Sequence, residues 1–463
     1  NKVIKNICCI GAGYVGGPTM AVIASNCPNL IINVVDINTK RINAWNSENL
    51  DYLPVFETGL DKLIKECRGK NLFFSTNIES CIKNADCIFI SVNTPTKEKG
   101  LGAGYASDLK WIESCARQIA EFSKGHTIVV EKSTLPVKTA ETIKKILESS
   151  QINHLKNISE RKSYTIISNP EFLAEGSAIN DLQNPDRVLI GGEDEVSIRQ
   201  ISSIYENWVE KEKIIVTNLW SAELSKLVAN AFLAQRISSI NSISALCEST
   251  GANIQEVAKA IGTDTRIGNK FLNAGPGFGG SCFKKDILNL VYLCRYYGLN
   301  EVADYWEQII NINIWQQKRI YQLVIKNLFG TISNKKLVIM GFSFKADTND
   351  TRESPSIQIS RDLLLEGADL NFYDPKVNEE QILDSFKDIS FEGKLTCFKN
   401  PYEAVSSSDA ILVLTDWKEF QYLDWLKIYD DMRKPAWIFD SRVCLDLNKL
   451  NHIGFKVWTL GTA

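Results

Sequence analysis

Histidine is scarce in this chain, which removes the side chain that most often serves as a general base or a zinc ligand. Only three histidines occur among 463 residues, His126, His154 and His452, and each is far from the others in the sequence. A zinc site or a histidine-centred triad needs such residues in a cluster. We therefore expect no metal site, and we expect Lys, Asp, Glu or bound water to carry the acid–base chemistry.

Paired cysteine motifs, long apolar segments and an excess of charge are also missing. The twelve cysteines include no CxxC pair, and several, such as Cys8, Cys9 and Cys87, lie in apolar stretches where a thiol behaves as a small hydrophobe. No apolar run reaches the roughly 18 residues that cross a bilayer, and the N-terminus lacks a signal-peptide layout. The formal net charge of -3 gives no reason to expect nucleic acid. We expect a cytoplasmic protein without disulfides and without membrane or nucleic-acid partners.

Length and composition otherwise indicate an ordinary globular protein with several domains. Apolar residues make up 44% and charged residues 23% of the chain. At roughly 100–200 residues per domain, this length predicts two to four domains. An α/β pattern at each end and a helical pattern between them predict domains over 1–212, 213–330 and 331–463.

The N-terminal segment has the pattern of a dinucleotide-binding unit. A short apolar strand over 7–10 is followed by the glycine turn GAGYVGG at 11–17 and by an apolar helix over 18–25. The next strand ends at Asp36, twenty residues after Gly16, where a carboxylate can accept hydrogen bonds from an adenosine ribose. Strand, turn, helix, strand and acid in this order predict a nicotinamide cofactor far more strongly than the glycines alone.

Further strands are predicted at DCIFISV, TIVVEKST and YTIISNP, with helices between them. This pattern is typical of a doubly wound parallel sheet, in which ligands lie beyond the carboxyl ends of the strands. Those ends read SVNTPT, EKST and NPEF, and each is rich in hydrogen-bonding groups or proline turns. The three ends predict one cleft.

The second half of the chain repeats part of this order after a helical middle. A long helix is predicted over 221–250, before Gly251, and it has the length of a spine between domains. KKLVIMGFSFKADTNDTRESPS then starts a second α/β pattern, whose next strand, DLNFYDP, ends at Asp374. Because Gly341 is followed by Phe342 and not by a glycine-rich turn, we expect no second nicotinamide cofactor there.

The segment GPGFGGSCFKKD carries the strongest candidate for a nucleophile. Four glycines over 275–280 permit close approach of the backbone to a ligand, and they deliver Cys282 to the predicted start of a helix. A helix N-terminus favours thiolate over thiol, and Asp286 follows on the same face. The alternative is a buried cysteine behind a flexible loop.

Two other pairs share the spacing of one helical turn. Lys226 and Asn230 project from one face of the long helix, either toward a site or into solvent. Glu171 and Glu175 follow Pro170, which predicts the first turn of a helix. One of these carboxylates can serve substrate and the other the cofactor, or both can simply stabilise the helix start.

Basic residues near the second α/β pattern are candidates for binding a diphosphate or a carboxylate. Lys345 lies just beyond a predicted strand, and Arg352 lies before a helix. Arg266 and Arg442 are weaker candidates, because isolated arginines are usually solvated or paired at the surface.

Seven motifs, in order along the chain, closely resemble those of the UDP-glucose 6-dehydrogenase family. They are GAGYVGG, SVNTPTK, EKSTLPV, NPEFLAEGSAI, LSKLVANAFLAQRISSIN, GFGGSCFKKD and GFSFKADTNDTRESP. The resemblance implies two Rossmann-like parallel-sheet domains joined by a central helical domain with one long spine helix. It also implies oxidation of the C6 alcohol of UDP-glucose to UDP-glucuronate with two NAD per substrate. Arg266 resembles the arginine that reaches a neighbouring subunit's substrate, which implies a homo-oligomer, either a dimer or a hexamer built from dimers.

The resemblance assigns roles position by position. The catalytic positions are Cys282, Lys226, Asp286, Glu171, Asn230 and Thr134. The cofactor positions are Gly11, Gly13, Tyr14, Val15, Gly16, Asp36, Arg41, Val92, Asn93, Thr94, Pro95, Thr96, Ser133, Thr134, Glu175, Cys282 and Arg352. The substrate positions are Glu171, Phe172, Leu173, Lys226, Asn230, Arg266, Phe271, Leu272, Asn273, Gly279, Phe344, Lys345 and Arg442.

These roles give a hypothesis for the mechanism. Lys226 and Asp286, through a shared water, take the proton of the C6 hydroxyl as a hydride leaves for NAD. Cys282 then captures the aldehyde as a thiohemiacetal, which a second hydride transfer oxidises to a thioester. Lys226 and Asn230 stabilise the oxyanion, and Glu171 positions the hydrolytic water.

Two alternatives stay open at this point. A related dehydrogenase could act on GDP-mannose or UDP-N-acetylmannosamine, although Ala174 in NPEFLAEG favours the glucose branch. A non-catalytic protein that senses NAD could keep the same fold, although the intact catalytic set argues against it.

The loop FLNAGPGFGG departs from animal members of the family, which have Lys and Val where this chain has Asn273 and Pro276.

Overall fold

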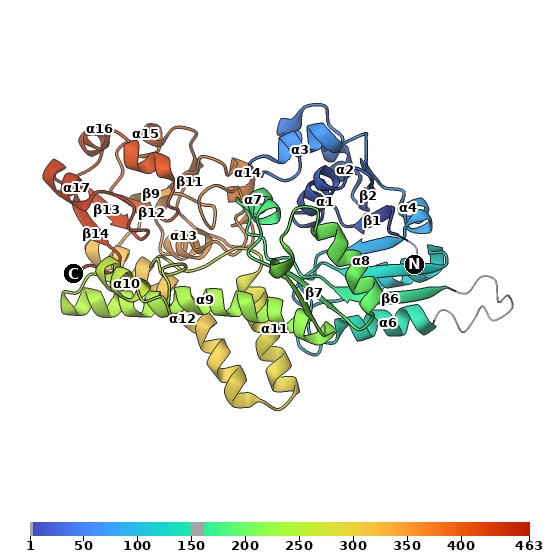
Figure 1. Cartoon of the computed structure of the whole chain (residues 1–463). Coiled ribbons are helices and arrows are strands. Elements are labelled where there is room, and N and C mark those ends of the chain that lie inside the picture. The colour runs from blue at the N-terminus through green and yellow to red at the C-terminus, as the bar shows by residue number, and fades with distance from the viewer. Residues whose placement is uncertain (1–2, 150–161) are drawn as a thin grey trace. The chain divides into compact units, whose positions relative to one another are not determined.

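The computed structural model describes residues 3–149 and 162–463, so His154 lies outside the described residues. The chain divides into two compact units, Asn1–Ala229 and Asn230–Ala463, which we describe separately. Figure 1 shows the elements of both units.

The first unit is built on a sheet whose strand order, in the described residues, is β3-β2-β1-β4-β5-β6-β7-β8. Its strands are β1 (Asn6–Ile10), β2 (Ile31–Val35), β3 (Leu72–Ser75), β4 (Cys87–Ile90), β5 (His126–Glu131), β6 (Ser163–Ser168), β7 (Val188–Gly192) and β8 (Ile214–Thr217). Its helices are α1 (Gly16–Asn26), α2 (Thr39–Trp45), α3 (Leu60–Cys67), α4 (Ile78–Asn84), α5 (Lys110–Phe122), α6 (Thr139–Ser149), α7 (Ala178–Gln183) and α8 (Glu195–Tyr205).

Strands β1 and β4 are buried along nearly their whole length, because helices cover both faces of the sheet. Their continuous apolar sequences are typical of such strands. The pairing is parallel except between β6 and β7, which run antiparallel through two residue pairs that join Ile167 to Gly192 and Ser168 to Gly191. The predicted parallel sheet therefore contains one antiparallel pairing. A reversed strand near the edge of a parallel sheet is common in α/β proteins.

The second unit contains a sheet with the order β11-β10-β9-β12-β13-β14, and every pairing in it is parallel. Its strands are β9 (Lys336–Met340), β10 (Asp369–Tyr373), β11 (Leu395–Cys397), β12 (Ala410–Val413), β13 (Trp437–Asp440) and β14 (Lys456–Thr459). Its helices are α10 (Ile254–Gly262), α11 (Phe283–Tyr296), α12 (Asn300–Asn327), α13 (Pro355–Leu365), α14 (Glu379–Asp384), α15 (Pro401–Ala404), α16 (Trp425–Asp431) and α17 (Leu447–Ile453).

Helix α9 (Leu219–Thr250) is the predicted spine, and it begins in the first unit and continues into the second. It ends before Gly251, which has a φ of 79° and so ends the helix without the strain that a side chain would add. Ile240 and Cys247 of α9 pack into the core of the second sheet. Figure 1 shows α11 and α12 side by side as a helical hairpin, and both pack on α9 through Ala231 and Ala234.

The predicted fold class is confirmed: two Rossmann-like sheets and a helical middle with one long helix. Among the described residues, no helix is both long and apolar enough to cross a membrane. Within 3–149 and 162–463, no three His, Cys, Asp or Glu side chains lie where they could hold a metal ion together.

Candidate active site

The glycine turn after β1 has the geometry of a dinucleotide-binding loop. Gly11 has a φ of 111°, and a Cβ there would lie 2.2 Å from the carbonyl oxygen of Ser91. A Cβ at Gly16 would lie 2.0 Å from the Gly11 carbonyl oxygen, whereas a Cβ at Gly13 would meet nothing within 4 Å. The turn lies where the strand order reverses, because β1 pairs with β2 on one side and with β4 on the other. Ligands bind at such switch points.

Asp36, the residue after β2, is held in place by hydrogen bonds to both of its carboxylate oxygens. One carboxylate oxygen accepts the backbone N–H of Ala12 at 2.9 Å and contacts the guanidinium of Arg41 at 3.1 Å. The other oxygen accepts the N–H of Asn38 at 2.9 Å. The carboxylate thus joins the glycine turn to the start of α2, and the residues fit the adenosine half of NAD.

The loops after β4 and β5 are joined to one another. The Thr94 hydroxyl donates to the Thr134 carbonyl at 3.0 Å, and the Ser133 hydroxyl donates to the Val92 carbonyl at 2.7 Å. These contacts bring together two of the three predicted strand ends. Of the other predicted cofactor residues in this unit, Tyr14 packs against the core and Val15 precedes α1, while Asn93 is exposed and Pro95 and Thr96 are half-buried.

The prediction of a helix that starts at Pro170 is wrong. Residues 171–174 have no regular structure, and the next helix, α7, begins only at Ala178. The reason is the side chain of Glu171, whose Oε1 accepts the N–H groups of Phe172 at 2.9 Å and Leu173 at 3.2 Å. A carboxylate that binds the N–H groups just after it favours a turn over a helix. Glu171 and Glu175 therefore do not share a helix face.

Glu171, Phe172 and Lys226 come together in the first unit. The Glu171 Oε2 lies 2.8 Å from the ammonium nitrogen of Lys132. The ring of Phe172 has the guanidinium of Arg187 over it at 3.7 Å and the ammonium of Lys226 at 5.2 Å. Cations are attracted to the face of an aromatic ring, so Phe172 helps to place the buried Lys226.

In the second unit, Cys282 caps the N-terminus of α11, and its side chain is exposed. Its backbone carbonyl accepts the N–H of Asp286 at 2.8 Å, so the two residues lie one turn apart as predicted. Asp286 is buried, and its Oδ2 accepts a hydrogen bond from the Asn230 amide at 2.6 Å. Asn230 lies on α9 one helical turn beyond Lys226.

Cys282 differs from the other eleven cysteines, all of which lie in the described part of the chain and are buried or half-buried. Burial raises the pKa of the Cys27 thiol to about 11 and that of the Cys115 thiol to about 12. These thiols stay protonated and unreactive at neutral pH. Cys282 is the cysteine that a ligand can reach.

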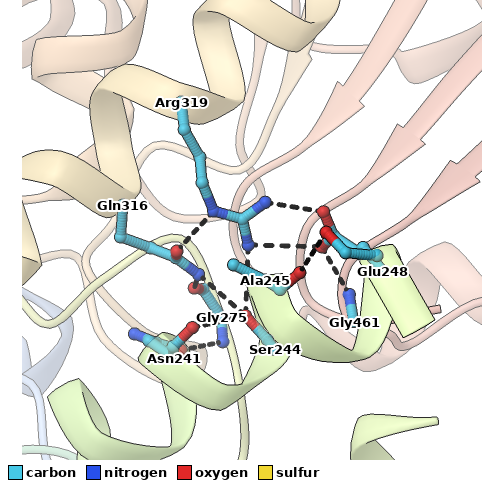
Figure 2. A network of polar contacts seen from close by, with 9 residues as sticks. Asn241, Ser244, Ala245, Glu248, Gly275, Gln316, Arg319 and Gly461 are labelled. Atoms are coloured by element: carbon cyan, nitrogen blue, oxygen red, sulfur yellow. Dashed lines mark hydrogen bonds and ion pairs between the residues drawn. The ribbon is translucent and has the colours of Figure 1, made fainter. Parts of the chain in front are cut away.

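The glycine-rich loop before Cys282 is fixed by amide side chains. Figure 2 shows the network around Gly275, whose N–H donates to Asn241 at 2.8 Å and whose carbonyl accepts from Gln316 at 2.9 Å. Gln316 accepts from Arg319 at 2.9 Å, and Arg319 pairs with Glu248 at 2.7 Å. The loop is thereby attached to α9 and α12.

Further along the loop, Asn313 pairs with the backbone of Phe278 as a neighbouring strand would. Its Oδ1 accepts the Phe278 N–H at 2.8 Å, and its amide donates to the Phe278 carbonyl at 3.1 Å. A Cβ at Gly277 would lie 2.7 Å from that Oδ1, and a Cβ at Gly279 would lie 2.5 Å from the carbonyl oxygen of Glu353. Glycine is required at both positions because the backbone packs this closely.

Arg442 connects this loop to the second sheet. Its guanidinium donates to the carbonyls of Leu414 at 2.8 Å and Phe344 at 3.0 Å. A Cβ at Gly275 would lie 3.3 Å from the same guanidinium. Lys345 lies over the Phe344 ring at 5.5 Å. The predicted substrate residues Phe344, Lys345 and Arg442 thus lie together beside the loop.

The remaining predicted residues are less tightly gathered. Arg352 forms an ion pair with Asp350 at 2.6 Å, and its carbonyl accepts the N–H of Gly280 at 2.7 Å. Arg266 is 87% exposed and pairs with its neighbour Asp264. In the loop itself Leu272 is buried, whereas Phe271 and Asn273 are exposed.

Several contacts in this site involve residues that the sequence analysis did not select. Lys132 in the first unit and Asn313 and Gln316 in the second hold proposed site residues in place. Lys132 could have been selected from the sequence, because a lysine directly after a buried apolar strand needs a charged partner. Asn313 and Gln316 lie within the predicted helical region and give no comparable signal.

Comparison with known proteins gives a consistent result along the chain. Three models of the UDP-glucose/GDP-mannose dehydrogenase family match: the NAD binding domain at residues 5–209, the central domain at 220–315 and the UDP binding domain at 338–447. The UDP-glucose 6-dehydrogenase of Gallus gallus is 55% identical over 99% of this chain and 93% of its own length. UDP-glucose 6-dehydrogenase 4 of Arabidopsis thaliana is 55% identical over 98% of this chain and 96% of its own length.

A solved structure agrees with these matches. The UDP-glucose dehydrogenase of Pyrobaculum islandicum superposes with a TM-score of 0.83 at 26% identity and covers 98% of both chains. The geometry of the glycine turn also fits the cofactor that the first domain of the family is named for. The chain therefore belongs to the UDP-glucose/GDP-mannose dehydrogenase family, and its first unit contains that family's NAD binding domain.

Proposed function

We propose that this protein oxidises the C6 alcohol of UDP-glucose to the carboxylate of UDP-glucuronate with NAD. The proposal follows from the identity of 55% with relatives named UDP-glucose 6-dehydrogenase, over nearly their whole length. The observation that carries the chemistry is Cys282, the exposed cysteine at the start of α11, one turn from a buried Asp286 that Asn230 binds.

The first unit would hold NAD, which would supply the acceptor for the hydride of each oxidation. Gly11 and Gly13, beside the N-terminus of α1, would leave room for its diphosphate, and Asp36 would bind its ribose. Thr94 and Thr134, joined by their hydrogen bond, complete the cleft.

The covalent steps belong to Cys282. Once Lys226 and Asp286 have removed the hydroxyl proton and a hydride has left C6, the thiolate attacks the resulting aldehyde and a C–S bond forms. The resulting thiohemiacetal has the tetrahedral carbon from which a second hydride can leave, and a thioester remains. Lys226 and Asn230 stabilise the negative oxygen of the tetrahedral states, each worth a few kcal/mol when well placed, about 3 in measured cases.

Hydrolysis of the thioester is assigned to Glu171. Its carboxylate takes a proton from water, whose oxygen bonds to the carbonyl carbon as the C–S bond breaks. The uridine diphosphate binds to the loop over 271–279 and to Phe344, Lys345 and Arg442.

The wider description of the protein is part of the proposal. We propose domains over 1–212, 213–330 and 331–463, and a homo-oligomer in which Arg266, exposed on its own unit, reaches a neighbouring subunit. Twelve unpaired cysteines favour a reducing compartment, and we propose the cytoplasm.

The yield of NADH tests the substrate and the reaction together. Complete conversion of limiting UDP-glucose should give two NADH per sugar, whereas GDP-mannose and UDP-N-acetylmannosamine should give none. One NADH per UDP-glucose would show that the reaction stops at the aldehyde, and a better yield with either other sugar would reassign the substrate.

The nucleophile is tested by Cys282→Ser, with Cys397→Ser, a half-buried cysteine in the second sheet, as the matched control. Cys282→Ser should lower turnover by about 10³-fold or more, and mass spectrometry should no longer detect a thioester during turnover. Full activity of Cys282→Ser would reject Cys282 as the nucleophile.

A further inference from the structure

The ammonium of Lys132, the first residue after β5, is buried and has three polar partners. Its side chain is 3% exposed. Three oxygens surround the nitrogen: Glu171 Oε2 at 2.8 Å, Asn169 Oδ1 at 3.1 Å and the Tyr205 hydroxyl at 3.1 Å. A lysine ammonium has three N–H donors, so these oxygens account for all of them.

The two neutral partners are themselves fixed. The Tyr205 hydroxyl donates to Asn169 Oδ1 at 2.5 Å, so its lone pairs remain for Lys132. The Asn169 amide donates to the Leu189 carbonyl at 2.9 Å, which keeps its oxygen turned toward the ammonium. Burial lowers the pKa of Lys132, but the charge of Glu171 and the Tyr205 oxygen outweigh it and hold that pKa above its ordinary value. The ammonium therefore stays charged.

Glu171 is equally well defined. Its side chain is 14% exposed, Oε1 accepts two backbone N–H groups, and Oε2 lies against Lys132. A carboxylate this far from water stays ionised only if a positive charge and donors compensate for the lost hydration. Arg187 is half-buried nearby and also interacts with Glu171 electrostatically, but its guanidinium lies over the Phe172 ring.

We propose that Lys132 is a positioning residue that keeps Glu171 oriented and ionised for the hydrolytic step; this inference rests on the proposed function. Lys132 transfers no proton. When the water oxygen bonds to the thioester carbon, one water proton goes to Glu171 and the sulfur of Cys282 leaves with the electrons of the broken C–S bond. Lys132 determines whether Glu171 is ready to accept that proton.

The test is Lys132→Met, which has a similar length and no charge. Both hydride transfers should stay fast, so a rapid burst of up to two NADH per subunit should appear, followed by steady turnover about 10²-fold slower than the wild type at neutral pH. The acidic limb of the kcat–pH profile should move to higher pH, because the unpaired carboxylate of Glu171 holds its proton more tightly. A uniformly slower burst and an unmoved acidic limb would overturn the inference.

A double-mutant cycle separates positioning from a general loss of structure. Because Lys132 acts through Glu171, adding Lys132→Met to Glu171→Gln should cause no further loss of hydrolysis. If the two losses multiply, Lys132 does not act through Glu171. Thermal unfolding and NAD affinity of each variant check that the first unit is folded.

Two further measurements keep the test decisive. If Lys132→Met does not fold, Tyr205→Phe removes one of the three oxygens that hold the ammonium, and it should move the acidic limb in the same direction by a smaller amount. An unmoved limb in Tyr205→Phe would then reject the inference. The wild-type yield of two NADH per UDP-glucose tests the proposed function independently, so its failure is distinguishable from a failure of the role of Lys132.

Discussion

The two sheets of this protein share a strand order, a glycine after the first strand and an acid after the second, but the contacts of these residues differ. In both sheets, six strands lie in the spatial order 3-2-1-4-5-6 when they are numbered along the chain within their own sheet. Gly11 and Gly341 follow the first strand of each sheet with φ values of 111° and 93°. Asp36 and Asp374 follow the second strand and accept backbone N–H groups from the turn after the first.

The difference lies in what fills the turn. In the first sheet, Gly13 borders open space. In the second sheet, Ser343 occupies the corresponding position and is fully buried. Asp374 accepts hydrogen bonds from the Ser343 hydroxyl, from the Trp417 indole and from four backbone N–H groups, those of Phe342, Ser343, Lys376 and Val377. The acid after the second strand supports the fold in the second sheet, whereas in the first sheet we propose that it binds a ligand.

The largest expected effect that separates the two acids is on stability. Asp374→Ala leaves six donor groups without their acceptor, four of them backbone N–H groups, and we expect a loss of about 3 kcal/mol or more in the free energy of unfolding of the second unit. Urea unfolding followed by tryptophan fluorescence measures it. A smaller loss than that of Asp36→Ala would contradict the assigned difference.

Asp36→Ala should act mainly on the cofactor. Loss of a carboxylate that binds ribose hydroxyls should raise the KM for NAD by about tenfold or more. Arg41→Ala, which removes a half-exposed partner of Asp36, should change the KM less. An unchanged KM in Asp36→Ala would mean that the cofactor does not bind at this turn.

Trp417→Phe tests the contact that is present only in the second sheet. The variant keeps an aromatic side chain but removes the indole N–H, whose nitrogen lies 3.1 Å from Asp374. We expect a loss of about 1 kcal/mol in the free energy of unfolding and no change in the KM for NAD. A change in NAD binding would mean that the second turn affects the cofactor.

The smallest expected effect concerns the fifth strands, β5 and β13, which both end in a buried acid. Asp440 accepts three backbone N–H groups. Glu131, in contrast, has no N–H donor among the described residues and faces the carboxyl group of Glu223. Burial, with the charge of Glu223, raises the pKa of Glu131 well above its ordinary value of 4.5, so the folded protein holds the proton that joins the two groups.

This gives a pH dependence with a defined sign. The stability from the Glu131 proton is fully present below about pH 4.5 and is lost as pH rises through the raised pKa of the folded state. Glu131→Gln keeps a donor toward Glu223 without a titrating proton, so its thermal midpoint should gain on the wild type as the pH rises above about 4.5. Asp440→Asn should lower the midpoint throughout, because its amide N–H groups face donors. Equal pH slopes for Glu131→Gln and the wild type would show that the pair holds no proton.

The sequence was sufficient for features that depend on local pattern. The apolar strand before Gly11, the acid at Asp36 and the long helix that ends before Gly251 were each predicted from spacing and composition, and the structure confirms their elements. Cys282 was likewise predicted at a helix start, which is its position.

Features that depend on partners distant in sequence were not predictable. The helix expected after Pro170 is absent because the Glu171 carboxylate binds its own backbone. That carboxylate pairs with Lys132, 39 residues before it, and Lys132 in turn binds Tyr205, 34 residues after Glu171. Asn313 similarly lies 35 residues from the loop backbone that it binds. No local pattern encodes such contacts.

The exposure of a single cysteine has a practical consequence for anyone who handles this protein. Because eleven thiols are buried or half-buried and Cys282 is exposed, a maleimide or iodoacetamide reagent should attach first at that position, with one label per chain. The same position would give a fluorescent reporter for occupancy of the sugar site. It also offers an attachment point for a covalent inhibitor built on a uridine scaffold.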